Sequence, residues 1–144
     1  MGSIGSVQLS GKAQKKVLEE GAAWAIKAGF GLQEDLETTE DGGAMVGADP
    51  EQISARALER GKQQLGTLGS GNHFLEIEVV QEIFDEAAAR AFGLRKGQIA
   101  VMIHTGSRGL GYQICDDYLA LVGKHANETG IVLPDRQLAC AYLN

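Results

Sequence analysis

The sequence has little of what marks secreted, fibrous or membrane proteins. Among 144 residues there are only 2 prolines and 2 cysteines, and aromatic residues make up 6%. Two cysteines, Cys115 and Cys140, do not supply the disulfide framework of a small secreted domain. The apolar runs are a few residues long, far short of the roughly 20 that a membrane helix needs, and no charged-then-apolar leader begins the chain. We therefore expect a reduced, cytoplasmic protein without a membrane segment.

What is present is typical of a folded globular chain. Hydrophobic residues make up 44% and charged residues 22%, and there are 20 glycines. This composition excludes a disordered tail and a collagen-like repeat. The length matches one ordinary domain, since domains cluster near about 100–150 residues.

The net charge of −6 is concentrated in one stretch of the chain. Residues 28–55 contain no Lys or Arg but seven carboxylates: Glu34, Asp35, Glu37, Glu40, Asp41, Asp49 and Glu51. Without these seven, thirteen basic residues face twelve acidic ones. Because the rest of the chain is nearly neutral, the overall acidity does not exclude a nucleic-acid partner.

The first half predicts two helices separated by an acidic loop. Apolar residues recur at helical spacing from Lys12 to Ala28, which predicts one amphipathic helix. Asp49-Pro50-Glu51-Gln52 is a typical helix start, and Gly61 is the expected end of that second helix.

The second half predicts strands mixed with helices. Residues 73–79 alternate between apolar and polar, which predicts a strand, and residues 81–92 favour a helix. The continuous apolar run 98–104 is typical of a fully buried strand. Apolar spacing predicts a last helix from Ile114 to about Gly123. The fold class is therefore α/β or α+β, a mixed sheet with flanking helices.

Two histidines are candidate metal ligands. His73 opens the first strand and His104 closes the second. If the strands are antiparallel, both imidazoles lie at the same end of the sheet; if they are parallel, they are roughly 20 Å apart and cannot share a site. Neutral imidazole is a common ligand of transition metals. The alternative is that both are hydrogen-bonded histidines with a structural role.

A glycine-rich turn and one strand face suggest phosphate and base recognition. The turn TGSRGLG lies between a strand and a helix, where backbone N–H groups and Arg108 could bind a phosphate. It matches neither the P-loop nor the dinucleotide fingerprint. Phe74 and Glu76 share one strand face and could stack a base and accept from its edge, or could be a core residue beside a surface one.

Cys115 and the pair Asp116-Asp117 lie on the last expected helix. We expect Cys115 to face the apolar side with a structural role. The two carboxylates point in different directions and are expected to be solvated.

Several segments together resemble one family. The blocks QLGTLGSGNHFLEIE (64–78) and VMIHTGSRGLGYQ (101–113) resemble signatures of the RtcB family of tRNA-splicing RNA ligases. The upstream stretches VLEEGAAWAIKAGFGLQEDLE and GADPEQIS also fit, so the resemblance covers nearly the whole chain.

The resemblance implies a GTP- and manganese-dependent ligase that joins a 3′-phosphate or 2′,3′-cyclic phosphate RNA end to a 5′-hydroxyl end through a guanylated histidine. The substrates would be tRNA halves or broken RNA, and an archease-type activator is an implied partner. By position, His73 and His104 resemble ligands of the two manganese ions. Asn72, Phe74 and Glu76 resemble nucleotide-binding residues, and Arg108 resembles a residue that binds RNA phosphate.

The chain also departs from the family pattern. It contains no DxGCG-type block with the bridging cysteine, and the guanylated histidine and the third metal-binding histidine of the family would lie beyond Asn144. Residues 1–144 would then be a single partial domain, an internal piece of the catalytic domain that is inactive alone. Two alternatives are a stand-alone metal- or phosphate-binding module without turnover, and a structural domain whose histidines are satisfied in the core.

Overall fold

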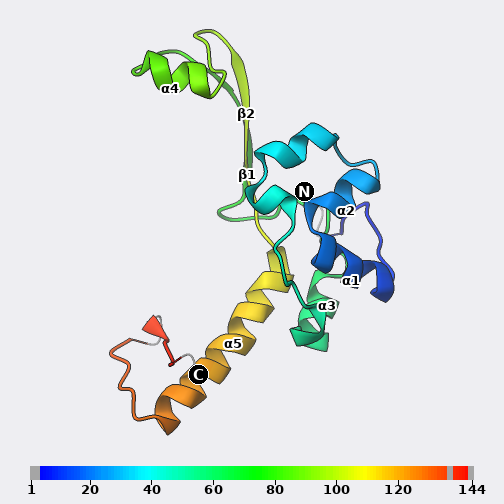
Figure 1. The fold of residues 1–144 in the computed structure, drawn as a ribbon, viewed down its shortest axis with the longest axis vertical. Helices are drawn as coiled ribbons and strands as arrows, with labels where there is room; N and C mark the ends of the chain where they lie inside the picture. Colours follow the sequence, from blue (N-terminus) through cyan, green and yellow to red (C-terminus); the bar gives the residue numbers. More distant parts are fainter. Residues whose placement is uncertain (1–3, 136–137, 143–144) are drawn as a thin grey trace.

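The computed structural model describes residues 4–135 and 138–142. Figure 1 shows an extended molecule in which a β-hairpin projects away from the N-terminal helices and a long C-terminal helix runs in the other direction. In chain order the elements are α1 (Gly11–Glu20), α2 (Ala22–Lys27), the 3₁₀ helices η1 (Gln33–Thr38), η2 (Glu40–Gly43) and η3 (Pro50–Gln52), α3 (Ala55–Gly61), β1 (Phe74–Val79), α4 (Glu86–Ala91), β2 (Ile99–His104) and α5 (Arg108–Glu128). The predicted mixture of helices with a sheet is confirmed; helices dominate it.

The predicted helix over residues 12–28 is wrong in one respect, because the chain breaks at Gly21. Gly21 has φ +55°, and a Cβ there would overlap the carbonyl oxygen of Gly43 at the end of η2. The close approach of η2 therefore requires glycine at this point. Two shorter helices, α1 and α2, result.

The predicted helix over residues 49–61 also divides. The Asp49 side chain accepts from the Glu51 N–H and caps only the short η3. The chain then leaves the helical conformation at Ile53, and the Ser54 side chain caps α3 by accepting from the Ala57 N–H. The expected acidic loop contains η1 and η2.

β1 and β2 pair antiparallel, with Phe74 opposite His104 and Val79 opposite Ile99. Both strands lie where the sequence predicts them. The pairing places His73, one residue before β1, at the same end of the sheet as His104. The two candidate histidines therefore lie at the same end of the sheet, as the antiparallel alternative predicts.

The two faces of this hairpin differ in chemistry. Cross-strand partners point to the same face, so one face carries only aliphatic side chains: Leu75, Ile77, Val79, Ile99, Val101 and Ile103. Each of these six is more than half exposed, from 52% for Val79 to 73% for Ile77. The prediction that residues 98–104 form a fully buried strand is therefore wrong, because in the described part of the chain the sheet has two strands and this face is not covered.

The last helix is longer than predicted. α5 begins at Arg108 rather than Ile114 and continues through Gly123 to Glu128. It packs on α3, where Gly61 lies against Leu110: a Cβ at Gly61 would come within 2.9 Å of the Leu110 Cβ. Cys115, expected on the apolar side of this helix with a structural role, is exposed. α4 is shorter than predicted, beginning only after the Asp85 cap. No described helix combines the length and apolarity that crossing a membrane requires.

We predict that the aliphatic face of the hairpin binds hydrophobic dyes. Replacing the cross-strand pair Ile77 and Val101 with Thr should lower 8-anilinonaphthalene-1-sulfonate fluorescence severalfold, because both side chains are over 60% exposed. Helical circular dichroism should not change. Glu78→Thr, on the opposite face, is the matched control. Equal fluorescence for the double variant and the parent would contradict the prediction.

Candidate functional site

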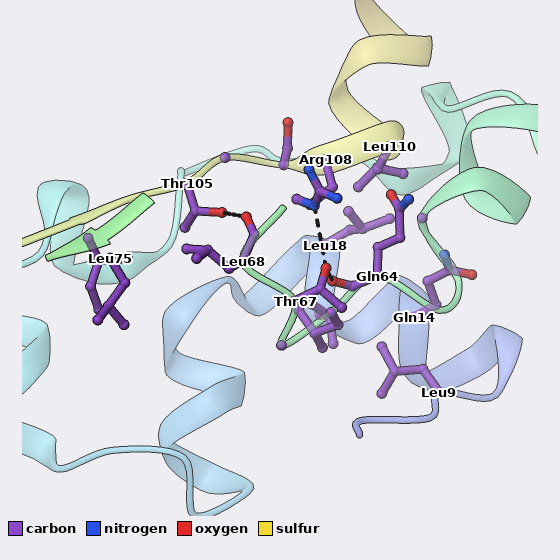
Figure 2. Close-up of a pocket in the computed structure, with 17 residues that line it drawn as sticks. Leu9, Gln14, Leu18, Gln64, Thr67, Leu68, Leu75, Thr105, Arg108 and Leu110 are labelled. Carbon is purple, nitrogen blue, oxygen red and sulfur yellow. Dashed lines mark hydrogen bonds between the residues drawn. The ribbon is translucent and has the colours of Figure 1, made fainter. Parts of the chain in front are cut away.

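Two glycine-rich loops meet beside the hairpin. The Thr105 hydroxyl donates to the Leu68 carbonyl at 2.6 Å, and the Gly109 N–H donates to the Gln64 side-chain oxygen at 2.7 Å. Figure 2 shows the first of these bonds together with Arg108 above Thr67, at a pocket lined by leucines, glycines and polar residues. The loop after β2 is thus fixed on the loop before β1. Because the Gly109 N–H is already bonded to Gln64, it is not available to a phosphate.

His73 and Arg108 converge on Gly69. Gly69 has φ +115°, and a Cβ there would overlap the Arg108 guanidinium and lie within 2.8 Å of the His73 ring. Only glycine leaves room for both side chains. Two residues from separate sequence blocks are therefore brought together over one backbone position.

The backbone at Arg108 is in the left-handed region, with φ +56°. Such a conformation costs a non-glycine residue about 1–2 kcal/mol. In this conformation the Arg108 Nε donates to the Thr67 hydroxyl over a long 3.4 Å, which places the guanidinium beside His73. A strained residue held by its surroundings is typical of functional positions.

A pocket of about 450 Å³ surrounds this pair. Its lining is Arg60, Gln64, His73, Gly106, Ser107, Arg108, Gly109 and Tyr112. Sequence reasoning missed Arg60, Gln64 and Tyr112. Nothing local in the sequence indicated that α3 packs on α5 and so brings these residues to the pocket.

The pocket is cationic. Among the described residues, no carboxylate lies within ion-pair distance of Arg60 or Arg108, although five other basic residues have such partners. Two guanidinium groups that are not neutralised, beside an imidazole, favour an oxyanion such as a phosphate.

Three of the other predicted residues, Phe74, Glu76 and His104, share the face of the hairpin opposite the aliphatic one. Phe74 and His104 face each other across the strands with ring centroids 5.2 Å apart and an interplanar angle of 20°. Glu76 shares their face by alternation. Asn72 is exposed in the preceding turn. Asn72, Phe74, Glu76 and His104 do not line the pocket of His73 and Arg108. The predicted site residues therefore form two separate groups at one end of the hairpin.

His73 fits the role of a metal ligand. Its Nδ1 lies 2.7 Å from the Ser70 carbonyl oxygen. A carbonyl oxygen only accepts, so Nδ1 carries the proton and the Nε2 lone pair is available; a backbone carbonyl is a common partner of ligating histidines. In the described part of the chain, however, no three His, Cys, Asp or Glu side chains gather as a ligand set. A metal here would need additional ligands.

A row of polar contacts joins α3 to α5 behind the pocket. Arg60 Nη1 donates to Gln113 Oε1 at 2.8 Å, Gln113 Nε2 donates to Asp117 Oδ1 at 2.8 Å, and the Ser54 hydroxyl donates to Asp117 Oδ2 at 2.5 Å. The expectation that Asp117 is merely solvated is wrong. The Ser54 hydroxyl, and secondarily the Gln113 amide, lower the pKa of Asp117 below its ordinary 3.8.

Comparison with known proteins identifies the family. Residues 1–144 all match the family described as tRNA-splicing ligase RtcB. The chain belongs to the RtcB family. It is 53% identical over 141 residues to the tRNA-splicing ligase RtcB of Methanocaldococcus jannaschii and 49% identical over 144 residues to that of Archaeoglobus fulgidus. A third relative, from Methanococcus maripaludis, is 51% identical over 144 residues.

These alignments take in 98–100% of the chain but only 15–30% of the relatives' lengths. The resemblance based on the two signature blocks is therefore confirmed. The chain spans less than a third of each of these RtcB relatives.

We predict that Gly69→Ala destabilises this RtcB-family chain by about 2–4 kcal/mol, because the new methyl group meets both Arg108 and His73 and the backbone is left-handed. Gly71→Ala is the matched control. Gly71 also has positive φ, +70°, but a Cβ there meets nothing within 4 Å, so the expected loss is about 1 kcal/mol. Chemical denaturation measures both, and equal losses would argue against the close packing at Gly69.

We predict an acid-sensitive contribution from Asp117. Because its folded pKa lies below the ordinary 3.8, its hydrogen bonds stabilise the fold above that value and lose this effect as the pH falls through the folded pKa. Asp117→Asn should lower Tm at about pH 6, and its difference from the parent should narrow as the solution is acidified below 3.8. Asp116→Asn, whose carboxylate makes no hydrogen bond in the described part of the chain, should show no such trend. A constant difference for Asp117→Asn would contradict this assignment.

Proposed function

We propose that this chain contributes RNA-end and metal binding to an RtcB-type RNA ligase. That ligase would join a 3′-phosphate or 2′,3′-cyclic phosphate end of tRNA halves or broken RNA to a 5′-hydroxyl end, with GTP and manganese. The observation that carries the proposal is the convergence of His73 and Arg108, one from each signature block, at a cationic pocket.

Arg108 and Arg60 would bind the RNA phosphate. Both guanidinium groups line the pocket, and neither has a carboxylate partner among the described residues. A guanidinium can form two parallel hydrogen bonds to one phosphate and keeps its charge at any physiological pH. Tyr112, whose ring centroid lies 5.0 Å from the Arg60 Cζ, would limit the movement of that arginine.

His73 and His104 would each hold one of two manganese ions through an imidazole nitrogen. The ions would supply charge neutralisation at the phosphates. The hydrogen bond of His73 Nδ1 to Ser70 supports this, since it fixes the tautomer that leaves Nε2 free. The remaining ligands would come from other parts of the ligase.

Asn72, Phe74 and Glu76 would contribute to the guanine-nucleotide site. Phe74 offers an aromatic surface and Glu76 a hydrogen-bond acceptor on one strand face, beside His104. A ring that stacks and a carboxylate that accepts from a base edge are suited to a purine. The histidine that would carry the guanylate, and an archease-type activator, are expected outside this chain.

A second candidate function is a binding module without turnover. It is favoured by one observation: two guanidinium groups, of Arg60 and Arg108, line one pocket together with His73. Calorimetric titration of the chain with Mn²⁺ distinguishes this binding module from a part of a ligase. Micromolar affinity that is lost in His73→Ala supports the module, whereas very weak binding fits a site whose other ligands lie elsewhere in a ligase.

The test of the ligase proposal is a chimera. Replacing the corresponding 144 residues of Archaeoglobus fulgidus RtcB with this chain should give an enzyme that joins a 3′-phosphorylated RNA to a 5′-hydroxyl RNA in the presence of GTP and Mn²⁺. His73→Ala or His104→Ala should abolish joining, and Arg108→Ala should reduce it at least about tenfold.

Glu78→Gln in the same chimera is the control, since Glu78 is on β1 but has no proposed role. The isolated chain with labelled GTP and Mn²⁺ should form no covalent guanylate. A folded chimera that joins RNA equally well without His73 or His104 would overturn the assignment of these residues.

A further inference from the structure

Gln113 is the most constrained polar side chain behind the pocket. It is only 3% exposed, and it is the one buried polar residue in the described part of the chain. Both ends of its amide are used: the oxygen accepts from Arg60 and the nitrogen donates to Asp117, each at 2.8 Å. A buried amide with both ends bonded has a single orientation.

Asp117 determines that orientation. A carboxylate only accepts hydrogen bonds, so it must face the NH₂ end of the Gln113 amide. Its second oxygen accepts from the Ser54 hydroxyl at 2.5 Å, which ties it to the N-cap of α3. The Gln113 oxygen is thereby turned toward Arg60.

We propose that Gln113 is a positioning residue that holds Arg60 at the pocket without neutralising it. The amide oxygen and the Tyr112 ring hold one edge and one face of the guanidinium, and no described residue bonds its other N–H groups, which are left for an anion. This inference rests on the proposed phosphate role of the pocket.

The neutrality of Gln113 is the essential feature. A carboxylate at this position would hold Arg60 equally well, but it would form an ion pair and cancel the charge that attracts a phosphate. In the observed arrangement the negative charge is on Asp117, one side chain farther away, where Ser54 and Gln113 donate to it.

The first test needs no ligand. In Gln113→Met, which keeps the length of the side chain but not its polar atoms, the ¹⁵N relaxation order parameter of the Arg60 Nε–H should fall from rigid to flexible values. The order parameter of the Arg108 Nε–H should not change. An Arg60 that stays as ordered as in the parent would overturn the proposal.

The second test moves one charge. The double variant Gln113→Glu with Asp117→Asn keeps the net charge but exchanges the carboxylate and the amide. Arg60 should remain ordered, because Glu at 113 accepts from it and Asn at 117 can donate to that Glu. Inorganic phosphate, titrated by ¹⁵N chemical shifts, should bind about tenfold more weakly. Parent-like affinity with an ordered Arg60 would overturn the claim that neutrality matters.

Two further variants separate this inference from the proposed function. Asp116→Asn, one residue from Asp117, should change neither the Arg60 order parameter nor the affinity for phosphate. Arg108→Ala tests the phosphate pocket itself: if it does not weaken phosphate binding, the proposed function fails, while the Arg60 order parameter still decides the role of Gln113. If a Gln113 variant does not fold, Asp117→Ala, at a half-buried position, removes the acceptor that orients the Gln113 amide and must still lower the order of Arg60, and unchanged order would overturn the proposal.

Discussion

The antiparallel register of β1 and β2 is the constraint on which the candidate site depends. Phe74 lies opposite His104, so the residues of the two signature blocks meet at one end of the hairpin. A shift of one residue would move each side chain of a strand to the other face. It would separate Phe74 from His104 and place charged side chains of β1 among the aliphatic ones. The difference between the two faces therefore specifies the register.

Outside the hairpin, polar contacts do much of the positioning. In the described part of the chain the buried residues are few and small, with Pro50, Ala57, Ala89 and Ala126 among the apolar ones, and no large side chain is fully buried. The loops are instead joined by bonds from Thr105 and Gly109 to the segment before β1. This agrees with a chain that covers 15–30% of the lengths of the RtcB relatives with which it was compared, since much of the apolar surface of the hairpin is not covered here.

The sequence predicted best where a pattern is local. Alternation predicted β1 and a continuous apolar run predicted β2, both nearly to the residue, and the glycine-rich blocks predicted the turns that flank them. The sequence predicted least about features that depend on contact with a distant segment. The helix break at Gly21 depends on contact with Gly43, and the bonded state of Asp117 depends on Ser54, 63 residues away. Neither partner could be inferred from spacing along the chain.

The sequence by itself determined the family and the mixture of helices and strands, and it supplied the candidate residues for phosphate, metal and base recognition, because these are encoded in contiguous blocks. Only the tertiary structure decided which of them meet. It placed His73 with Arg108 over Gly69 and put Phe74, Glu76 and His104 on the opposite face. It also added Arg60 and its buried support, Gln113, to the pocket. The reason is physical: strand register and the packing of α3 on α5 juxtapose residues about 30–50 positions apart, and such contacts depend on the shape of both surfaces rather than on any local pattern.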